Sequence, residues 1–257
     1  MDYVQYLVFE TSTNKIAINL EYVLEVIRMP KWTKYPNSSD NVKGIFNLRD
    51  KVIPLIDFRK LLGYNSIEEE TNDLIVLLKQ REQDHINWIN ELLASIAEQR
   101  EFKLTTDPHK CKFGQWYYSF QTNNFMLKAF LDEFEKPHKF IHEIGYTVNN
   151  LIKEKKYEEA EQIAAATRDK QLKLMLNLFR ELYKIIKNSM IEFVVIVDMG
   201  SGIKSFTVDK INRIINVNAE DINKLEESQF NGIAQEVIKK ENELILKLDI
   251  ESLLKEF

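Results

Sequence analysis

The chain of 257 residues has a single cysteine, only seven glycines and no long apolar run. One thiol cannot form an internal disulfide, so that cysteine is a core residue, a metal ligand or a reactive group. So few glycines argue against a glycine-rich phosphate loop. No stretch approaches the roughly 18 apolar residues of a membrane span, and the first residues lack a signal-peptide pattern. We therefore expect a cytoplasmic protein without direct membrane insertion.

Charge of one sign is not in excess either. Lysine and arginine total 35 against 40 aspartate and glutamate, and the two signs are interspersed along the chain. A phosphate backbone attracts a concentrated basic stripe, so nucleic acid is not an expected partner. Hydrophobic residues make up 44% of the chain, which is ample for sizeable cores and argues against disorder.

The pattern of the sequence changes twice along the chain. Residues 1–79 and 191–257 carry short apolar runs separated by turn residues, which is typical of β-strands. Residues 80–190 carry apolar side chains at intervals of three and four, which is typical of amphipathic helices. The helical segments expected there are 80–103, 111–118, 123–153 with a break at Pro137, and 156–189. The sequence predicts a multidomain α+β protein.

The two β-rich segments match each other in order, which indicates a duplicated β unit. The matched stretches are 8–10 with 196–198, 17–23 with 205–211, and 44–62 with 232–254, the last with a longer loop in the second copy. An antiparallel bundle with an even number of helices begins and ends on the same side, so a loop between the two copies can accept it. We interpret the helical block as such an insertion.

All four histidines and the only cysteine fall between residues 85 and 142. His138 and His142 are one helical turn apart, so both imidazoles project from one face, and His85 lies on an apolar helix face of its own. Three imidazoles directed into a bundle core need partners, and a shared cation would take up their lone pairs. Cys111 would complete a tetrahedral site of one sulfur and three nitrogens, which suits zinc better than calcium or magnesium.

Each of these residues also has a plainer interpretation. A lone core histidine bonded to a carbonyl is commoner than a ligand, and His109, beside a proline, is expected to be an exposed loop residue. Trp88 and Trp116 are expected to pack around the site and exclude water. Lys139 stands where the helical protease motif has glutamate after its first histidine, and four protein ligands leave no open position. The sequence therefore favours a metal with a sensory or a structural role. A zinc hydrolase is the less favoured alternative.

Residues 42–63, VKGIFNLRDKVIPLIDFRKLLG, resemble the signature of CheW-like domains, and ELILKLDIESLL near the end resembles the closing strand and helix of that family. The resemblance covers residues 1–79 and 191–257 and implies two small five-stranded β-barrels without catalytic activity. Asp50 departs from the pattern, because the family usually has glycine there in a tight turn with positive φ.

The middle block, residues 80–190, resembles the chemoreceptor zinc-binding domain, a four-helix bundle. The resemblance lies in His85-x-x-Trp88, in Cys111-Lys-Phe-Gly-Gln-Trp-Tyr, and in His138-x-x-x-His142. It implies that Zn²⁺ is held by His85, Cys111, His138 and His142. The metal would then sense zinc or an oxidant such as hypochlorous acid acting on Cys111, or would only staple the bundle.

Together the two resemblances imply a chemotaxis scaffold protein peripheral to chemoreceptor arrays. Such an adaptor binds the regulatory domain of a CheA-type histidine kinase and the cytoplasmic tips of chemoreceptors. Arg49 is the candidate receptor contact, and Val23, Ile27 and Phe46 are candidates for the groove between the barrels. The plainer interpretations are a solvated turn arginine and three core residues. We expect a signal from the metal to pass through the junctions at 79–81 and 188–192.

One segment is ambiguous. Residues 73–79, DLIVLLK, are either a strand exchanged with the other barrel or the start of the first inserted helix. Their isoleucine and valine content and the preceding Thr-Asn-Asp favour the exchanged strand.

Overall fold

The computed structural model describes residues 3–122, 124–198, 200, 202–225 and 234–250. The chain divides into two compact units, one formed by residues 1–69 with 191–257 and the other by residues 70–190. The first is built mainly from strands and the second from helices, so the predicted α+β composition is confirmed. None of the helices in the described ranges is long and apolar enough to cross a membrane.

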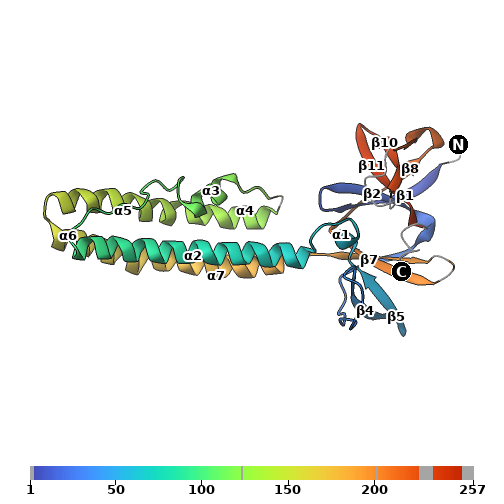
Figure 1. The fold of residues 1–257 in the computed structure, drawn as a ribbon. Coiled ribbons are helices and arrows are strands. Elements are labelled where there is room, and N and C mark those ends of the chain that lie inside the picture. Colours follow the sequence, from blue (N-terminus) through green and yellow to red (C-terminus); the bar gives the residue numbers. More distant parts are fainter. Residues whose placement is uncertain (1–2, 123, 199, 201, 226–233, 251–257) are drawn as a thin grey trace. The chain divides into compact units, whose positions relative to one another are not determined.

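The strands of the first unit form two sheets (Figure 1). Their bounds are β1 Val4–Thr11, β2 Asn14–Asn19, β3 Val23–Arg28, β4 Val42–Leu48, β5 Lys51–Ile56, β6 Phe193–Asp198, β7 Ile203–Val208, β8 Lys210–Val217, β9 Ile222–Lys224, β10 Ala234–Lys240 and β11 Glu243–Leu248. One sheet has the order β8-β1-β2-β11-β10-β9 and the other the order β3-β6-β7-β5-β4. Helix α1, Phe58–Leu61, and 3-10 turns at Leu20–Tyr22 and Ala219–Asp221 connect strands.

The prediction of two small five-stranded β-barrels is confirmed only in part, because the described strands do form two sheets but not closed barrels. Within the described residues both sheets are open, and one has a sixth strand, the three-residue β9. The second sheet has only an isolated bridge, Thr33 to Ile45, at the corresponding place. Side chains from the β3–β4 connection, Met29 and Trp32, cover the core of that sheet, so apolar packing replaces the ladder that would close a barrel.

The predicted duplication appears in the strand pairing. The β1–β2 hairpin pairs Leu7 with Ile18, and the β6–β7 hairpin pairs Val195 with Phe206 at the same offset along the chain. Each hairpin lies in the sheet formed by the later strands of the other copy: β1–β2 between β8 and β11, and β6–β7 between β3 and β5. The two copies therefore exchange hairpins, and neither sheet is built from one copy alone.

Part of the predicted alignment between the copies needs correction. Gly44 pairs with Leu55 next to a register shift, and Glu236 pairs with Lys247 next to the equivalent shift. Glu236 is therefore the counterpart of Gly44, because the extra residues of the second copy lie before β10 rather than after it. Residues 232–233, which were matched to 44–45, and the closing helix predicted at 251–257 lie outside the described residues.

Central strands bury both faces. Tyr6 and Val8 of β1 point into the core of the six-stranded sheet, while Leu7 and Phe9 point into a core shared by both sheets. In the shared core the ring of Phe9 lies 5.7 Å from that of Phe206. The two-residue hairpin turns Arg49-Asp50 and Glu241-Asn242 have positive φ at both positions, which matches the right-handed twist of the strands. Asp50, at φ 67°, therefore adopts the strained turn that its sequence position suggested.

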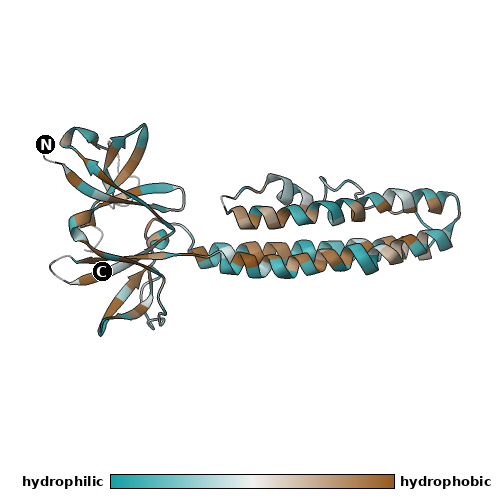
Figure 2. Ribbon diagram, turned by 180° about the vertical axis from the view of Figure 1, so that it is seen from behind, coloured by the Kyte–Doolittle hydropathy of each residue, from teal (hydrophilic) through white to brown (hydrophobic). Residues whose placement is uncertain are grey.

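Among the described residues of the helical unit, four continuous helical stretches surround one hydrophobic core. They are α2 (Ile67–Ala97), α3 (Lys112–Ser119), α4 (Phe125–Leu131) continued by a 3-10 turn into α5 (Glu135–Lys153), and α6 (Tyr157–Thr167) continued by a π turn into α7 (Lys173–Asn188). Figures 1 and 2 show the longest of these helices running alongside one another. Pro137 lies in the first turn of α5, where its missing N–H costs little, so the break expected at Pro137 falls just before it, at Asp132–Phe134.

The exchanged strand predicted at residues 73–79 is wrong, because this segment is helical within α2. The Ser66 hydroxyl accepts the Glu69 N–H at 3.1 Å, and the Glu69 carboxylate accepts the Ser66 N–H at 2.8 Å. This capping box starts the helix, and Thr71, Ile75 and Leu78 then fall on one buried face. The cap and the helical spacing outweigh the strand propensity of isoleucine and valine.

Candidate metal centre

The structure brings together the four residues that the sequence proposed as ligands, from three helices. His85 lies in α2, His138 and His142 lie one turn apart in α5, and Cys111 is the N-cap residue of α3. One donor atom from each side chain lies within 4.8 Å of all the others. The Cys111 Sγ and the His138 Nε2 are 3.1 Å apart. The four donor atoms are close enough together for one ion to contact all of them.

The outer ring nitrogens explain the orientation of two histidines. The Nδ1 of His85 donates to the Arg81 carbonyl at 2.7 Å, and the Nδ1 of His142 donates to the Thr105 carbonyl at 3.1 Å. Each Nε2 is thereby left as an acceptor facing the cluster. Both Nε2 atoms are buried and have no hydrogen-bond partner within the described residues. Such orphaned acceptors are costly in a protein interior, and a cation would satisfy both.

Burial also keeps these side chains in the form that binds a metal. The exposed fractions of His85, His138 and His142 are 3%, 0% and 1%. Burial lowers the pKa of His85 to about 4 and that of His138 to about 2, the latter with a contribution from its histidine neighbours, and it lowers the pKa of His142 as well. All three imidazoles are therefore neutral near pH 7 and keep a lone pair.

Cys111 is held by the start of α3. Its sulfur accepts the Gly114 N–H at 3.1 Å, in the manner of an N-cap side chain. Burial raises the pKa of the Cys111 thiol, and hydrogen bonds from the Phe113 and Gly114 backbone oppose this rise. A bound divalent cation would outweigh burial and stabilise the thiolate. Gly114 is required here, because a Cβ atom would lie only 1.8 Å from the Pro108 carbonyl oxygen.

Aromatic rings enclose the cluster. The indole of Trp88 lies 5.2 Å from the His142 ring, and its N–H donates to the Thr105 carbonyl, the same oxygen that orients His142. Phe113 lies 5.6 Å from His85 and 5.0 Å from His138. Trp116 contacts Phe113 instead of a ligand, so it lies one layer further out than Trp88.

The fourth histidine, His109, which was expected to be an exposed loop residue, is exposed and stacks on Tyr118 with ring centroids 4.0 Å apart. Sequence reasoning missed the carbonyls of Arg81 and Thr105. Every residue has a carbonyl, so no residue-type signal could have pointed to these two.

Three nitrogens and one sulfur form a donor set suited to a tetrahedral zinc ion. Calcium and magnesium prefer oxygen ligands, and none of the four donors is oxygen. Four protein donors also fill the usual coordination number of zinc, so no position is left for the water that hydrolytic sites require. The residues therefore fit a closed structural or sensory centre.

The four proposed interface residues differ in how far they are exposed to solvent. Arg49 is 80% exposed and forms an ion pair with Glu25 at 3.2 Å, while Val23 and Ile27 of β3 are partly buried. Phe46 is only 4% exposed and belongs to the core of the five-stranded sheet. Phe46 therefore fits the plainer interpretation, a core residue, better than a surface contact.

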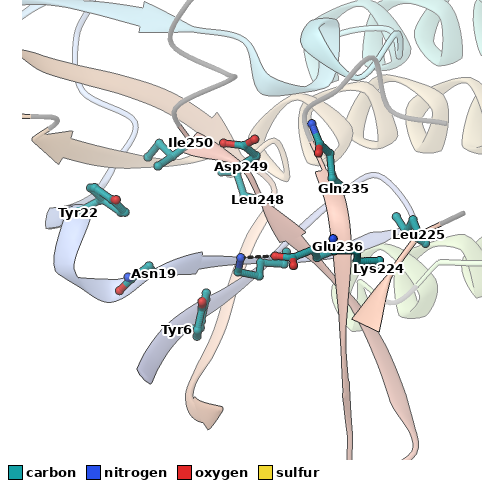
Figure 3. Close-up of a pocket in the computed structure, with 11 residues that line it drawn as sticks. Tyr6, Asn19, Tyr22, Lys224, Leu225, Gln235, Glu236, Leu248, Asp249 and Ile250 are labelled. Atoms are coloured by element: carbon teal, nitrogen blue, oxygen red, sulfur yellow. Dashed lines mark hydrogen bonds and ion pairs between the residues drawn. The ribbon is translucent and has the colours of Figure 1, made fainter. Parts of the chain in front are cut away.

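A second candidate site is a pocket of about 570 Å³ at one end of the six-stranded sheet (Figure 3). Its lining carries Lys224 and Lys247 against Glu236 and Asp249, and the Lys247 ammonium pairs with Glu236. In the other copy the positions of Lys247 and Glu236 are held by Leu55 and Gly44. The pocket is thus specific to one copy. Its charges balance, however, and unlike the histidine cluster it has no orphaned buried donor or acceptor among the described residues.

The fold and the cluster define a protein with a duplicated β unit and a helical unit that carries four candidate metal ligands. Two profiles of known domain families match this chain. The CheW-like domain profile matches residues 5–96, and the chemoreceptor zinc-binding domain profile matches residues 85–149. The two matches adjoin along the chain and overlap at residues 85–96.

Individual relatives agree with this assignment. Chemotaxis protein CheV3 of Helicobacter pylori is 38% identical over 64 residues, which are 25% of this chain and 21% of the relative. Chemotaxis protein CheW of Klebsiella aerogenes is 24% identical over 98 residues, 37% of this chain and 59% of the relative. Chemotaxis protein CheW of Thermotoga maritima is 31% identical over 68 residues, 26% of this chain and 45% of the relative. The match spans about half of each CheW relative and a fifth of CheV3.

Among solved structures, the scaffolding protein TtCheW from Thermoanaerobacter tengcongensis superimposes with a TM-score of 0.46 and 11% identity, covering 96% of this chain and 90% of that one.

Proposed function

We propose that this chain is a non-catalytic chemotaxis adaptor that couples chemoreceptors to a CheA-type histidine kinase and carries one Zn²⁺ in its helical unit. The adaptor role is supported by the CheW-like domain and by relatives named as chemotaxis proteins. His85, Cys111, His138 and His142 would hold the ion. The observation that carries the zinc proposal is the convergence of three sealed imidazoles and one thiol within 4.8 Å, with the inner nitrogens of His85 and His142 unsatisfied.

In this proposal the helical unit is a four-helix zinc-binding module inserted into the CheW-like domain. The sequence pattern puts the insert at 80–190, and the N-terminal part of α2 extends it to about residue 70. The β unit binds the kinase regulatory domain and the receptor tips, so the protein resides at the periphery of receptor arrays. The bound ion supplies a Lewis acid that keeps Cys111 deprotonated and ties three helices together.

We propose further that the metal centre is sensory. Cys111 is the one ligand that is only half-buried, so an oxidant such as hypochlorous acid reaches it more easily than it reaches the histidines. Loss of one ligand, or of the ion itself, would loosen the helical core, because metal binding free energy contributes directly to its folding.

Two polar anchors in the β unit flank the insert and would carry such a change. Before it, Lys60 pairs with Glu69, the residue that caps α2. After it, Glu192 pairs with Lys43 of β4, and both side chains are only 9% exposed. The pair Lys43–Glu192 has no equivalent in the other copy, where Gln235 occupies the place of Lys43. Its presence only where the insert joins the sheet is consistent with a role in coupling.

A purely structural zinc is the alternative, in which the ion only staples the helices. The two functions are separated by a pull-down of the kinase regulatory domain and a receptor-tip fragment with the full-length chain, loaded with zinc or treated with chelator. The sensory proposal predicts that binding or kinase output changes between the two states, and that Cys111→Ser abolishes the difference. His109→Gln, which alters an exposed histidine outside the cluster, should retain it. Equal binding and kinase output in the two states would leave only the structural role for zinc.

A further inference from the structure

The four donors of the centre are not equally enclosed. The three imidazoles are almost fully buried, whereas Cys111 is half-buried and faces a cavity of about 320 Å³. This cavity, here called the mouth, touches His85, Cys111 and His142 on its inner side. The other residues that line it are Asp84, Asn87, Trp88, Leu104, Thr105, Lys110, Lys112 and Phe113. An incoming molecule that uses the mouth therefore meets the sulfur ligand with little rearrangement of the protein.

Aromatic rings pack around the imidazoles, and two of them, Trp88 and Phe113, also line the mouth. Phe113 packs edge-on against His85 and His138, and Trp88 packs edge-on against His142. Phe179 of α7 packs against Phe113 of α3 with ring centroids 5.3 Å apart, and its ring lies 6.5 Å from the His85 imidazole. Phe113 and Phe179 are completely or almost completely buried. His85 and His142 also touch the mouth, but they are only 3% and 1% exposed, whereas Cys111 is half-buried, so an incoming molecule reaches the sulfur first.

The mouth carries net positive charge. Lys110 and Lys112 flank Cys111 in sequence and both line the cavity, against one lining carboxylate, Asp84. Asp84 is paired with Arg81 at 3.3 Å and Lys110 with Asp107 at 3.6 Å, whereas Lys112 has no ion pair within the described residues, so Lys112 is the lining charge that is left unbalanced. A dication held by three neutral imidazoles and one thiolate would add one further positive charge. Anions are drawn to such a cavity, and focusing of charge in a partly enclosed site raises their rate of encounter.

We propose that the mouth is a ligand-exchange port, through which small anionic metal-binding molecules, carboxylates or thiolates, remove zinc from the centre or deliver it. This inference rests on the proposed zinc site. It adds the path by which zinc enters or leaves and the charge of the molecules that exchange it. In the exchange an oxygen or sulfur of the incoming anion donates an electron pair to the ion as the Cys111 sulfur leaves with its own pair. The released thiolate takes a proton from water, and no atom changes oxidation state.

The port is tested by the kinetics of zinc removal from the zinc-loaded full-length chain. Two chelators with six donor atoms each are compared: ethylenediaminetetraacetate, which is anionic, and tetrakis(2-pyridylmethyl)ethylenediamine, which is neutral. We expect the rate to rise with chelator concentration for the anion. Lys112→Glu should slow the anionic chelator by on the order of threefold to tenfold and leave the neutral one unchanged. Added salt should diminish the effect of charge.

Lys103→Glu is the matched control. It makes the same charge change on an exposed residue of the connection that leads from α2 to α3, but Lys103 does not line the mouth. Rates that are independent of chelator concentration and charge, or that fall equally in Lys103→Glu and Lys112→Glu, would overturn the port. A chain that never binds stoichiometric zinc would instead overturn the proposed function. Circular dichroism of each variant confirms that the helices are intact before rates are compared.

Discussion

At the scale of single residues, the centre depends on backbone carbonyls as much as on its donors. Arg81 and Thr105 each accept the outer N–H of one histidine and thereby turn the inner nitrogen toward the cluster. Gly114 allows the chain to pass close to Pro108 and places its N–H on the Cys111 sulfur. These contacts fix the donor set before any ion arrives, which lowers the entropy cost of binding.

Gly114→Ala should damage the centre although alanine is the better helix former by about 1 kcal/mol. Its Cβ would overlap the Pro108 carbonyl oxygen, so the backbone around Cys111 must shift, and such overpacking costs about 1–3 kcal/mol. We expect a lower melting temperature and weaker zinc binding, measured by thermal denaturation and competition with a zinc indicator. Gln115→Ala, in the same helix and exposed, should leave both unchanged. Parent-like zinc affinity in Gly114→Ala would show that this contact does not position Cys111.

The buried histidines should make the zinc-free chain sensitive to acid. Their pKa values are lowered by burial, to about 4 for His85, so the unfolded chain binds more protons than the folded one below pH 6.5. Stability is then fully present above that pH and falls as pH drops, by about 1.4 kcal/mol per pH unit for each histidine. Urea denaturation of zinc-free protein between pH 7 and pH 4.5 measures this slope. His138→Phe should flatten it, whereas a slope equal to that of the parent would contradict the account.

At the scale of elements, the junctions of the insert carry the most informative contacts. The capping box of Ser66 and Glu69 starts α2, and the Lys43–Glu192 pair ties the residue before β6 to a side chain of β4. Burial raises the pKa of Glu192, and the Lys43 ammonium opposes that rise. Burying two charges has a desolvation cost that the attraction between them offsets only in good geometry, so such a pair is weak evidence for stability alone.

Breaking the Lys43–Glu192 pair should therefore lower the stability of the β unit only when one buried charge loses its partner. We expect Glu192→Gln or Lys43→Met to destabilise the β unit by about 3 kcal/mol, and the double variant Lys43→Met with Glu192→Leu to recover most of the loss. Chemical denaturation of the three variants measures both effects. In the pull-down, the double variant should be stable yet respond less to zinc. A double variant with parent-like zinc response would restrict the pair to a packing role.

Sequence reasoning succeeded for elements whose pattern is local. Histidines one turn apart in α5 and the apolar spacing of α7 are visible in the chain itself. It failed at residues 73–79, where β-branched side chains were weighed above the cap at Ser66 and Glu69. It also failed to anticipate the open sheets, since whether two sheet edges meet depends on how loop residues such as Trp32 cover a core. That packing is tertiary and leaves no periodic signal.

At the scale of the whole molecule, the duplicated segments form the β unit and the inserted segment forms the helical unit. Two copies of one β pattern exchange hairpins to build the sheets, while the chain between them forms a separate helical unit with its own core. The order of the repeat could be read from the sequence, because equal offsets preserve the pairs Leu7–Ile18 and Val195–Phe206. The exchange could not, because both arrangements use the same strands.

The central claim is that one ion is bound by all four donors at once. X-ray absorption spectroscopy of the full-length chain loaded with one equivalent of zinc tests it most directly. The account predicts one sulfur at about 2.3 Å and three imidazole nitrogens at about 2.0 Å, with the sulfur shell lost in Cys111→Ser. A spectrum without sulfur in the parent, or with a water oxygen in place of a histidine, would contradict it.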